Sequence, residues 1–378
     1  MKIILFANTD WYLYNFRLAL AEGLRGQGHE VILLSPPGEY GSLLKKAGFR
    51  WVAFPLSRRG TNPLQDLYTI WKLYQFYKTE RPDYVHNFTV KCVLYSSIAA
   101  HLAGGCKIIN SITGLGYIFI NDDLKARLLR SLVRNFYKVA LRDTRVVFQN
   151  LDDRALFLQQ GLVSEVQTVL VKGSGVDTKK FALSPEPAGM PQVVLPARML
   201  WDKGVAEFVS AARILRDAAV NVQFVLAGNC DPANPAAVPL EQLQAWQQEG
   251  VIKWSGWQDD MVQVYANSHI VCLPSYREGL PRSLIEASAC GRPIVATDVP
   301  GCRQVISQGE NGLLVPVRNA EALADALCQL LADAPLRRKM GLRGREMVEA
   351  DYSTERIVSE TLEIYQNQNG GQSHTCPH

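Results

Sequence analysis

One stretch in the second half of the chain decides the fold. Residues 269–301 read HIVCLPSYREGLPRSLIEASACGRPIVATDVPG. Two apolar runs, 269–274 and 292–298, flank a segment with the composition of a helix. Buried parallel strands are continuous apolar runs, and a helix is the usual connection between two of them. The stretch therefore predicts a strand–helix–strand unit with a right-handed crossover.

The same alternation extends over most of the chain. Strands are expected at 2–7, 30–35, 51–56, 83–88, 107–112, 145–150 and 166–171, and then at 192–197, 221–228, 251–256, 269–274, 292–298 and 312–317. Helical periods lie between them, for example at 14–27, 63–80, 91–103 and 122–143. The residues after 333 have helical patterns only. We predict an α/β protein with two doubly wound parallel sheets.

A change in composition marks the boundary between the two sheets. The Gly-rich segment 172–177 is followed by the Pro-rich segment 184–191. We therefore expect an N-terminal Rossmann-like domain at 1–175 and a C-terminal one at 176–378, with the last helix free to cross back onto the first. Two such domains would face each other across a cleft at the carboxyl ends of their strands, where ligands bind in this architecture.

Composition excludes several classes of protein. Apolar residues make up 47% of the chain and charged residues 20%, as in ordinary globular proteins, and no apolar stretch is long enough to span a membrane. The first strand lacks the cleavage site of a signal peptide. The eight cysteines are scattered without a C-x-x-C pair, so we expect reduced thiols and a cytoplasmic protein. The cluster His374, Cys376 and His378 is better explained as a frayed terminus than as a metal site.

Charge is unevenly distributed along the chain. Residues 1–175 contain 22 Lys and Arg against 13 Asp and Glu, whereas the remainder is acidic. The excess peaks at 124–145, where Arg130, Arg134, Lys138 and Arg142 recur at helical spacing. Two interpretations stay open for this segment: an amphipathic helix with a solvated basic side, or a surface for anionic lipid or a phosphorylated acceptor.

Two segments of the second half carry the chemistry. In ARMLWDKG (197–204), Arg198 follows a strand and Lys203 precedes a helix, a good arrangement for a diphosphate. In residues 274–301, Glu278 precedes the loop Gly279, Leu280 and Pro281, and Glu286 lies about one turn into the next helix. One carboxylate can accept hydrogen bonds from sugar hydroxyls at the loop, while the other can face a ribose. A solvated loop acid and a helix-dipole partner are the alternatives.

With these motifs, the chain resembles the family 4 retaining nucleotide-sugar glycosyltransferases, which have the GT-B fold. The resemblance rests on R-x4-K-G at 198–204, E-G-x6-E at 278–286, GSGVD at 173–177 and NGLLVP at 311–316. It implies that Arg198 and Lys203 hold the donor diphosphate, that Glu278 contacts the donor sugar and that Glu286 binds the ribose. The nucleotide base would lie near Gly256, Trp257 and Asp259.

The first domain is expected to bind the acceptor. Its first loop, NTDWYLYNFR at 8–17, lacks the Gly-Gly of several relatives and offers Tyr14 and Arg17 instead. The H-x-H of many members is reduced to His86, with Phe88 in the second position, so His86 is either a catalytic contact or a core imidazole. Lys91 and Thr113, the latter in the TGLGY loop, are further candidates. The segments YNFR, SRRGTNP, VHNFT and TGLGY resemble a subgroup that extends undecaprenyl-diphosphate-linked glycans, for which Arg58 and Arg59 would meet the acceptor diphosphate.

The resemblance implies transfer of a hexose or N-acetylhexosamine from a nucleotide-diphosphate sugar, UDP being the expected nucleotide, to a hydroxyl of a lipid-linked glycan. We expect no metal or other cofactor, because two cations would carry the leaving-group charge and no D-x-D motif stands out. The enzyme would work in the cytoplasm or peripherally on the inner face of the cytoplasmic membrane.

The sequence also allows other functions. A nucleotide-sugar epimerase shares the fold, and a non-enzymatic anion-binding protein would also explain the cations. A dehydrogenase lacks support because no G-x-G-x-x-G follows the first strand. Nucleic acid is not expected as a partner, since no binding motif accompanies the basic half.

Overall fold

The computed structural model describes residues 1–56, 62–114, 133–232 and 234–367. The chain divides into two compact units, one formed by residues 1–175 together with the chain from Thr354 onward, and the other by Val176–Ser353. The first unit ends at Gly175, in the Gly-rich segment, and the last helix belongs to this unit rather than to the second. Arg58, Arg59, the segment 124–132 and the cluster at 374–378 lie outside the described residues.

The first unit is built on a parallel sheet of seven strands in the order β3-β2-β1-β4-β5-β6-β7. The strands are β1 (Lys2–Phe6), β2 (Glu30–Ser35), β3 (Arg50–Ala53), β4 (Tyr84–Phe88), β5 (Lys107–Ile112), β6 (Arg145–Phe148) and β7 (Thr168–Leu170). Between them lie α1 (Asp10–Tyr12), η1 (Leu13–Arg17), α2 (Leu18–Gly26), α3 (Gly41–Lys46), α4 (Pro63–Glu80), α5 (Val90–Ala103), a helical segment at 133–140, α7 (Leu151–Gln159) and η3 (Glu165–Gln167).

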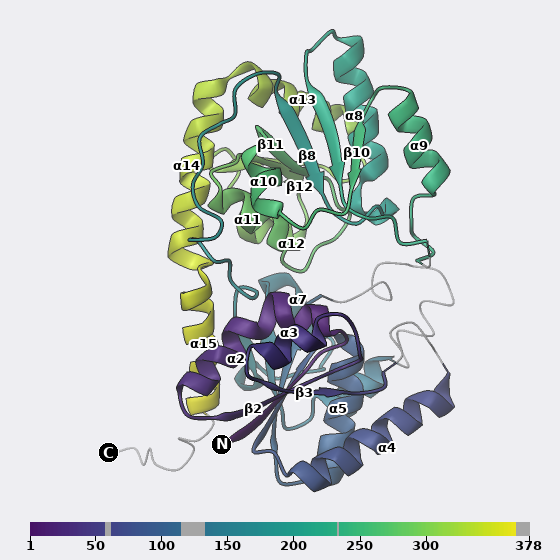
Figure 1. The fold of residues 1–378 in the computed structure, drawn as a ribbon, viewed down its shortest axis with the longest axis vertical. Coiled ribbons are helices and arrows are strands. Elements are labelled where there is room, and N and C mark those ends of the chain that lie inside the picture. Colours follow the sequence, from purple (N-terminus) through teal and green to yellow (C-terminus); the bar gives the residue numbers. More distant parts are fainter. Residues whose placement is uncertain (57–61, 115–132, 233, 368–378) are drawn as a thin grey trace. The chain divides into compact units, whose positions relative to one another are not determined.

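The last helix, α15 (Thr354–Asn367), closes the core of the first unit. It lies beside α2 (Figure 1), and the contact is so close that a Cβ on Gly23 would stand 2.7 Å from Val358 Cγ1. Its buried side chains Ile357, Ile364 and Tyr365 join one face of the sheet core, which is apolar along β1, β2 and β4. The chain therefore completes its first core with its last helix.

The second unit repeats this plan with six parallel strands in the order β10-β9-β8-β11-β12-β13. The strands are β8 (Gln192–Pro196), β9 (Gln223–Ala227), β10 (Lys253–Gly256), β11 (Ile270–Leu273), β12 (Ile294–Thr297) and β13 (Gly312–Val315). The helical elements are η4 (Trp201–Lys203), α8 (Val205–Asp217), α9 (Leu240–Gln248), α10 (Met261–Ala266), α11 (Arg282–Ala289), α12 (Pro300–Val305), α13 (Ala320–Ala332) and α14 (Ala334–Asp351).

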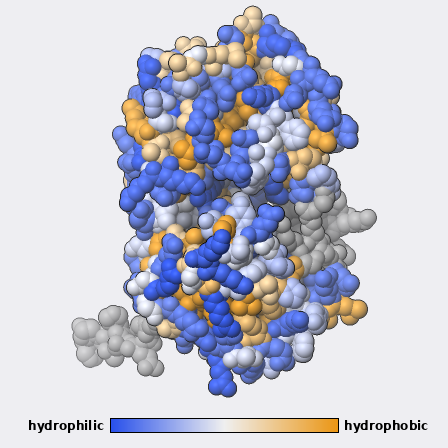
Figure 2. All heavy atoms as spheres, viewed as in Figure 1, coloured by the Kyte–Doolittle hydropathy of each residue, from blue (hydrophilic) through white to orange (hydrophobic). Residues whose placement is uncertain are grey.

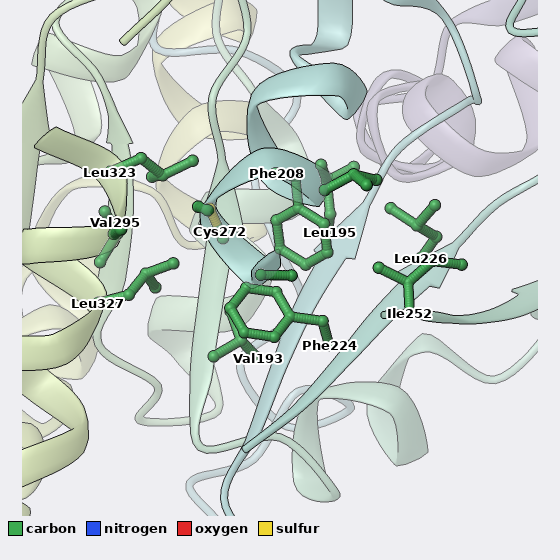
Figure 3. Packing of buried hydrophobic residues seen from close by; sticks show 14 of the residues in the cluster. Val193, Leu195, Phe208, Phe224, Leu226, Ile252, Cys272, Val295, Leu323 and Leu327 are labelled. Atoms are coloured by element: carbon green, nitrogen blue, oxygen red, sulfur yellow. The ribbon is translucent and has the colours of Figure 1, made fainter. Parts of the chain in front are cut away.

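The core of the second unit is tightly interlocked. Figure 3 shows side chains from four strands meeting those of α8 and α13, among them Leu195, Phe208, Phe224 and Leu327. The rings of Phe208 and Phe224 pack edge to face with centroids 5.0 Å apart. Such packing makes the sheet a rigid base for the loops at its carboxyl edge.

The predicted fold class is confirmed, and each predicted strand corresponds to an observed one. The strand expected at 51–56 instead covers Arg50–Ala53, because Pro55 has no N–H for the ladder. The helix expected at 14–27 begins earlier, at Asp10, and contains a π-helical turn over Leu13–Arg17. Of the basic segment, residues 133–140 are helical. In the part of the chain that is described, no helix is long and apolar enough to cross a membrane.

Candidate functional site

Two loops of the second unit meet where its strand order reverses. Strands β8 and β11 are neighbours, and their carboxyl ends lead into the loops 197–204 and 274–281. The N–H of Tyr276 donates to the carbonyl of Asp202 at 2.9 Å. Gly204 has φ +71°, and a Cβ there would stand 2.1 Å from the carbonyl oxygen of Pro274. Glycine at 204 is thus what lets the two loops approach.

This approach joins Lys203 and Glu278, two of the predicted donor-binding residues. The Nζ of Lys203 donates to Glu278 Oε1 at 2.5 Å, and the two side chains are only 20% and 12% exposed. A pair so well sheltered from water is screened much less than a surface ion pair. Glu278 is therefore no solvated loop acid, and the pair holds both side chains in fixed positions.

The segment after Glu278 is held by α12. The N–H of Gly301 donates to the carbonyl of Glu278 at 3.2 Å, and a Cβ on Gly301 would lie 2.7 Å from the carbonyl oxygens of Glu278 and Gly279. Leu280 is partly buried and Pro281 is buried just before α11 begins. The predicted donor-binding loop 279–281 is consequently packed against its own unit.

Arg198 differs from Lys203 in being open to solvent. Its side chain is 57% exposed, and its nearest charged partner is Asp231, with Nη1 and Oδ2 3.8 Å apart. An exposed pair at that distance contributes little to stability. The guanidinium is therefore available for an anionic ligand, as the predicted role requires.

Glu286 lies within α11, one helical turn beyond Arg282. Its Oε1 accepts from Arg282 Nε at 2.8 Å, and its Oε2 accepts from the Tyr265 hydroxyl at 3.1 Å. Burial raises the pKa of Glu286, and the Arg282 charge offsets part of that effect. The carboxyl is too buried to serve only as a helix-dipole partner on the surface. Glu286 and Glu278 each have their own cation.

The predicted base-binding segment follows β10. Gly256 ends the strand with φ +65°, and Trp257 is half exposed, with its ring N–H donating to Asp259 Oδ1 at 2.7 Å. An exposed indole held by a hydrogen bond offers a flat apolar surface for stacking. The contact with a base stays a prediction.

Sequence reasoning missed a second group that fixes the same loop. The Tyr276 hydroxyl donates to Glu207 Oε1 on α8 at 2.8 Å, and the Arg318 guanidinium lies 4.7 Å from the centre of the Tyr276 ring. Burial, together with Glu207, raises the pKa of Tyr276 to about 12. Tyr276 is thus a neutral hydrogen-bond donor two residues before Glu278. No spacing in the sequence links these residues.

The predicted acceptor residues Tyr14, Arg17, Lys91 and Thr113 lie in three segments of the first unit, the first two of them in η1. Tyr14 packs on Tyr40 with ring centroids 5.4 Å apart, and Lys91 Nζ is 3.9 Å from Asp66 Oδ1. Thr113 is half-buried after β5. Arg17 is buried at the end of η1. No hydrogen bond or ion pair that the structure shows joins any two of these four residues.

His86 lies inside the core of the first unit. Its Nδ1 is 2.7 Å from the Tyr365 hydroxyl and its Nε2 is 2.8 Å from Ser111 Oγ, so both ring nitrogens have partners. Burial, with a contribution from Arg17, holds the pKa of His86 well below its usual range. The structure favours the alternative of a neutral core imidazole over a catalytic contact.

Comparisons with known proteins identify the family. A family model described as glycosyl transferases group 1 matches residues 190–333, and one described as glycosyl transferase 4-like matches residues 2–150. The chain belongs to the group 1, family 4 glycosyltransferases.

Within the described residues, no group of three or more His, Cys, Asp and Glu side chains is placed to hold a metal ion.

Relatives of this glycosyltransferase span its length. It is 29% identical, over 97% of this chain and 98% of the relative, to the N,N'-diacetylbacillosaminyl-diphospho-undecaprenol alpha-1,3-N-acetylgalactosaminyltransferase of Campylobacter jejuni. It is 22% identical, over 75% of each chain, to the UDP-Gal:alpha-D-GlcNAc-diphosphoundecaprenol alpha-1,3-galactosyltransferase of Escherichia coli.

Solved structures agree on the GT-B fold. A glycosyltransferase of Rickettsia africae superposes with a TM-score of 0.79 at 20% identity, covering 98% of this chain and 99% of the other. HepE of Anabaena, in complex with UDP and glucose, superposes with a TM-score of 0.78 at 18% identity, covering 97% and 99%. These matches show the fold, while the family models and the relatives establish a glycosyltransferase and set aside the epimerase, dehydrogenase and binding-protein alternatives.

Proposed function

We propose that this glycosyltransferase moves a hexose or N-acetylhexosamine from a UDP-sugar to a hydroxyl of an undecaprenyl-diphosphate-linked glycan, with retention at the anomeric carbon. The observation that supports the donor half is the ion pair of Lys203 and Glu278 between the loops that follow β8 and β11, with the exposed Arg198 on the first of these loops. The lipid-linked acceptor is supported by the names of the Campylobacter jejuni and Escherichia coli relatives.

The residues of the second unit suit a departing nucleoside diphosphate. Negative charge develops on the diphosphate as the glycosidic bond breaks, and cations stabilise that charge best when they are oriented beforehand. Lys203 is held in place by Glu278, while Arg198 is exposed. Glu278 then faces the transferred sugar, and Glu286 faces the ribose. We propose that these cations supply the charge stabilisation without a metal.

A direct test combines ligand binding and turnover. UDP at 100 times its dissociation constant should stabilise the fold by about 2.7 kcal/mol. We expect a larger thermal shift with UDP than with GDP or ADP, and no change of that shift in EDTA. Transfer from UDP-N-acetylhexosamines and UDP-hexoses to undecaprenyl-diphosphate-linked sugars is then assayed by mass. If EDTA abolishes transfer and a divalent cation restores it, the proposal that no metal is needed is wrong, while the proposed transfer reaction still stands.

We further propose that the first unit rests on an anionic membrane surface through α4. Its outward side chains include Leu64, Leu67, Tyr68 and Trp71, which are 49–76% exposed. Orange surface lies beside blue where α4 reaches the outside (Figure 2). Lys72 lies over the Tyr68 ring at 5.1 Å, whereas Asp66 pairs with Lys91. Exposed aromatic and aliphatic groups beside lysine are typical of helices at a lipid interface.

The membrane proposal is tested with one variant and a matched control. Trp71→Ser should reduce cosedimentation with vesicles that contain anionic phospholipid, because an indole prefers the interface. Leu342→Ser removes a side chain of the second unit that is similarly exposed, at 52%, and should leave cosedimentation unchanged. Equal binding by wild type and Trp71→Ser would show that α4 does not contact the bilayer.

A further inference from the structure

Arg17 is a buried cation for which the described part of the chain shows no acidic partner. It is 5% exposed at the end of η1, and its Nη2 donates to the Tyr12 hydroxyl at 2.8 Å. Its Nε is buried and has no hydrogen-bond partner. Among the described residues no carboxylate pairs with Arg17, and neighbouring His86 is held neutral. Such a charge is strongly unfavourable in a protein interior unless another group balances it.

The guanidinium is enclosed by aromatic rings. Its carbon atom lies 4.3 Å from the centre of the Phe88 ring and 5.4 Å from that of Tyr12. Cation–π contacts orient a guanidinium and offset part of its desolvation. They do not use its in-plane N–H donors, however. Arg17 therefore keeps donors in a fixed plane, as the binding of an oxyanion requires.

Arg17 lies near the edge of the first sheet at which ligands of this architecture commonly bind. Strands β1 and β4 are neighbours where the order of the first sheet reverses, and ligands of such sheets bind at the carboxyl ends of those strands. Phe88 is the last residue of β4, and Arg17 belongs to the segment that follows β1. That segment is a π-helical turn, a feature frequent at functional sites.

Strain at the end of β4 is a separate observation at the same place. Thr89 has φ +72° and ψ 153°, a conformation that is almost confined to glycine. It directly follows Phe88 and precedes α5, and its side chain makes no capping hydrogen bond to that helix. Residues held in this way persist where the surroundings impose them, and they concentrate at ligand sites.

We propose that Arg17 binds a phosphate oxygen of a substrate diphosphate on the first unit. The inference rests on the proposed function, because it takes its anion from a substrate of the transfer reaction. Two substrates carry this chemistry, the polyprenyl-diphosphate acceptor and the nucleotide donor. The bound oxyanion would accept from the free guanidinium donors and balance the buried charge.

A purely structural role makes the opposite prediction for stability. If Arg17 only fills space between Phe88 and Tyr12, its replacement by methionine should lower the melting temperature and leave substrate affinity alone. If the Arg17 charge is balanced only when an anion is bound, Arg17→Met should keep or raise the melting temperature of the ligand-free protein. The same variant should weaken diphosphate binding.

The experiment compares wild type, Arg17→Met, Arg17→Lys and Arg25→Met in the full chain. Arg25 is the matched control, because its guanidinium lies 4.2 Å from the Phe49 ring and donates to the Ala47 carbonyl. Calorimetry measures affinity for inorganic pyrophosphate, farnesyl diphosphate and UDP. Arg17→Met should weaken at least one of them by about 10- to 100-fold, the range of one charge-assisted contact. Arg25→Met should weaken none.

The probes separate the two sources of the phosphate. Weakened farnesyl diphosphate binding with unchanged UDP binding, and a raised acceptor KM, assigns Arg17 to the acceptor. Weakened UDP binding assigns it to the donor. Arg17→Lys keeps the charge but loses the paired N–H donors of the guanidinium, so its affinity for the probes should be intermediate. It replaces Arg17→Met if that variant does not fold. Unchanged affinity for all three probes overturns the inference. Wild type that binds pyrophosphate but not UDP would overturn the proposed function instead.

Discussion

The two sheets share a strand order, but the charged residues where that order reverses are balanced differently in the two units. In the second unit, Lys203 and Glu278 meet between β8 and β11 as a sheltered ion pair. In the first unit, Arg17 lies beside Phe88 at the end of β4 with aromatic neighbours, and no carboxylate in the described part of the chain pairs with it. The topology sets where a ligand can bind in both cases. The charge balance then differs: the Lys203–Glu278 pair is neutral in itself, whereas Arg17 is a cation that no carboxylate of the described residues pairs with.

This difference has a consequence for stability as well as for binding. Removing a partner from the paired site leaves a sheltered charge alone, whereas removing Arg17 takes an unpaired charge away. The first change should destabilise the fold, and the second should not. Variants in the two units therefore separate balanced from unbalanced charge.

The largest effect is expected for Lys203→Met. Loss of one fixed donor to the leaving diphosphate should lower kcat by about 10²- to 10³-fold. Glu278, left without its cation, should lower the free energy of unfolding by about 1–3 kcal/mol. Steady-state kinetics and urea unfolding measure the two.

Arg213→Met is the control for this variant. It removes an exposed partner of Glu249, with the pair 2.6 Å apart, and should change stability by less than about 1 kcal/mol and kcat not at all. Equal kinetic effects of the two substitutions would refute the assigned role of Lys203.

Gly204→Ala should damage the same site by another route. The Cβ would stand 2.1 Å from the Pro274 carbonyl oxygen, and the backbone has φ +71°. The loops that carry Lys203 and Glu278 must separate, so we expect a loss of about 2–4 kcal/mol together with lower kcat. Gly250→Ala has φ +74° with nothing within 4 Å, and should lose only about 1 kcal/mol. A similar loss in both variants would show that the clash is relieved without moving the loops.

How much of the fold and of the candidate site could be predicted from sequence depends on how far apart the contacting residues are along the chain. Apolar runs and turn residues are local, so the strands and the Gly-rich segment 172–177 could be predicted, and the spacing of Arg198 and Lys203 marked the donor segment. The i,i+4 pair of Arg282 and Glu286 is also local, because residues four apart are neighbours on a helix.

The remaining contacts join residues far apart in the chain. Lys203 and Glu278 are 75 positions apart, and Glu207 and Tyr276 are 69 apart. Only the packed second unit brings them together. His86 is buried against Tyr365 of α15, at the other end of the chain, and no local pattern near His86 indicates that contact. Arg58 and Arg59 remain predictions.

Thr89→Gly tests whether the end of β4 is strained. Glycine adopts φ +72° freely, so the variant removes a strain of about 1–3 kcal/mol while it adds up to about 1 kcal/mol of unfolded-state entropy. We expect the melting temperature to rise. Thr89→Ala keeps a Cβ and should not share the gain. If Thr89→Ala stabilises as much as Thr89→Gly, the backbone at this position is unstrained.

The smallest expected effect is on the pH dependence of stability, compared for Glu286 of the second unit and Glu80 of the first. Burial raises the pKa of Glu286, so its stabilising contribution is complete below the ordinary glutamate pKa and is lost as pH rises through the raised value. Arg50 lowers the pKa of Glu80 through a hydrogen bond, so that contribution is present above the ordinary pKa and is lost as pH falls. Between about pH 3 and 7, the melting temperature of Glu286→Gln relative to wild type should therefore rise as the pH is raised, and that of Glu80→Gln should fall, each by roughly 2 °C. Slopes of the same sign would mean that the Arg282 pair, rather than burial, governs Glu286.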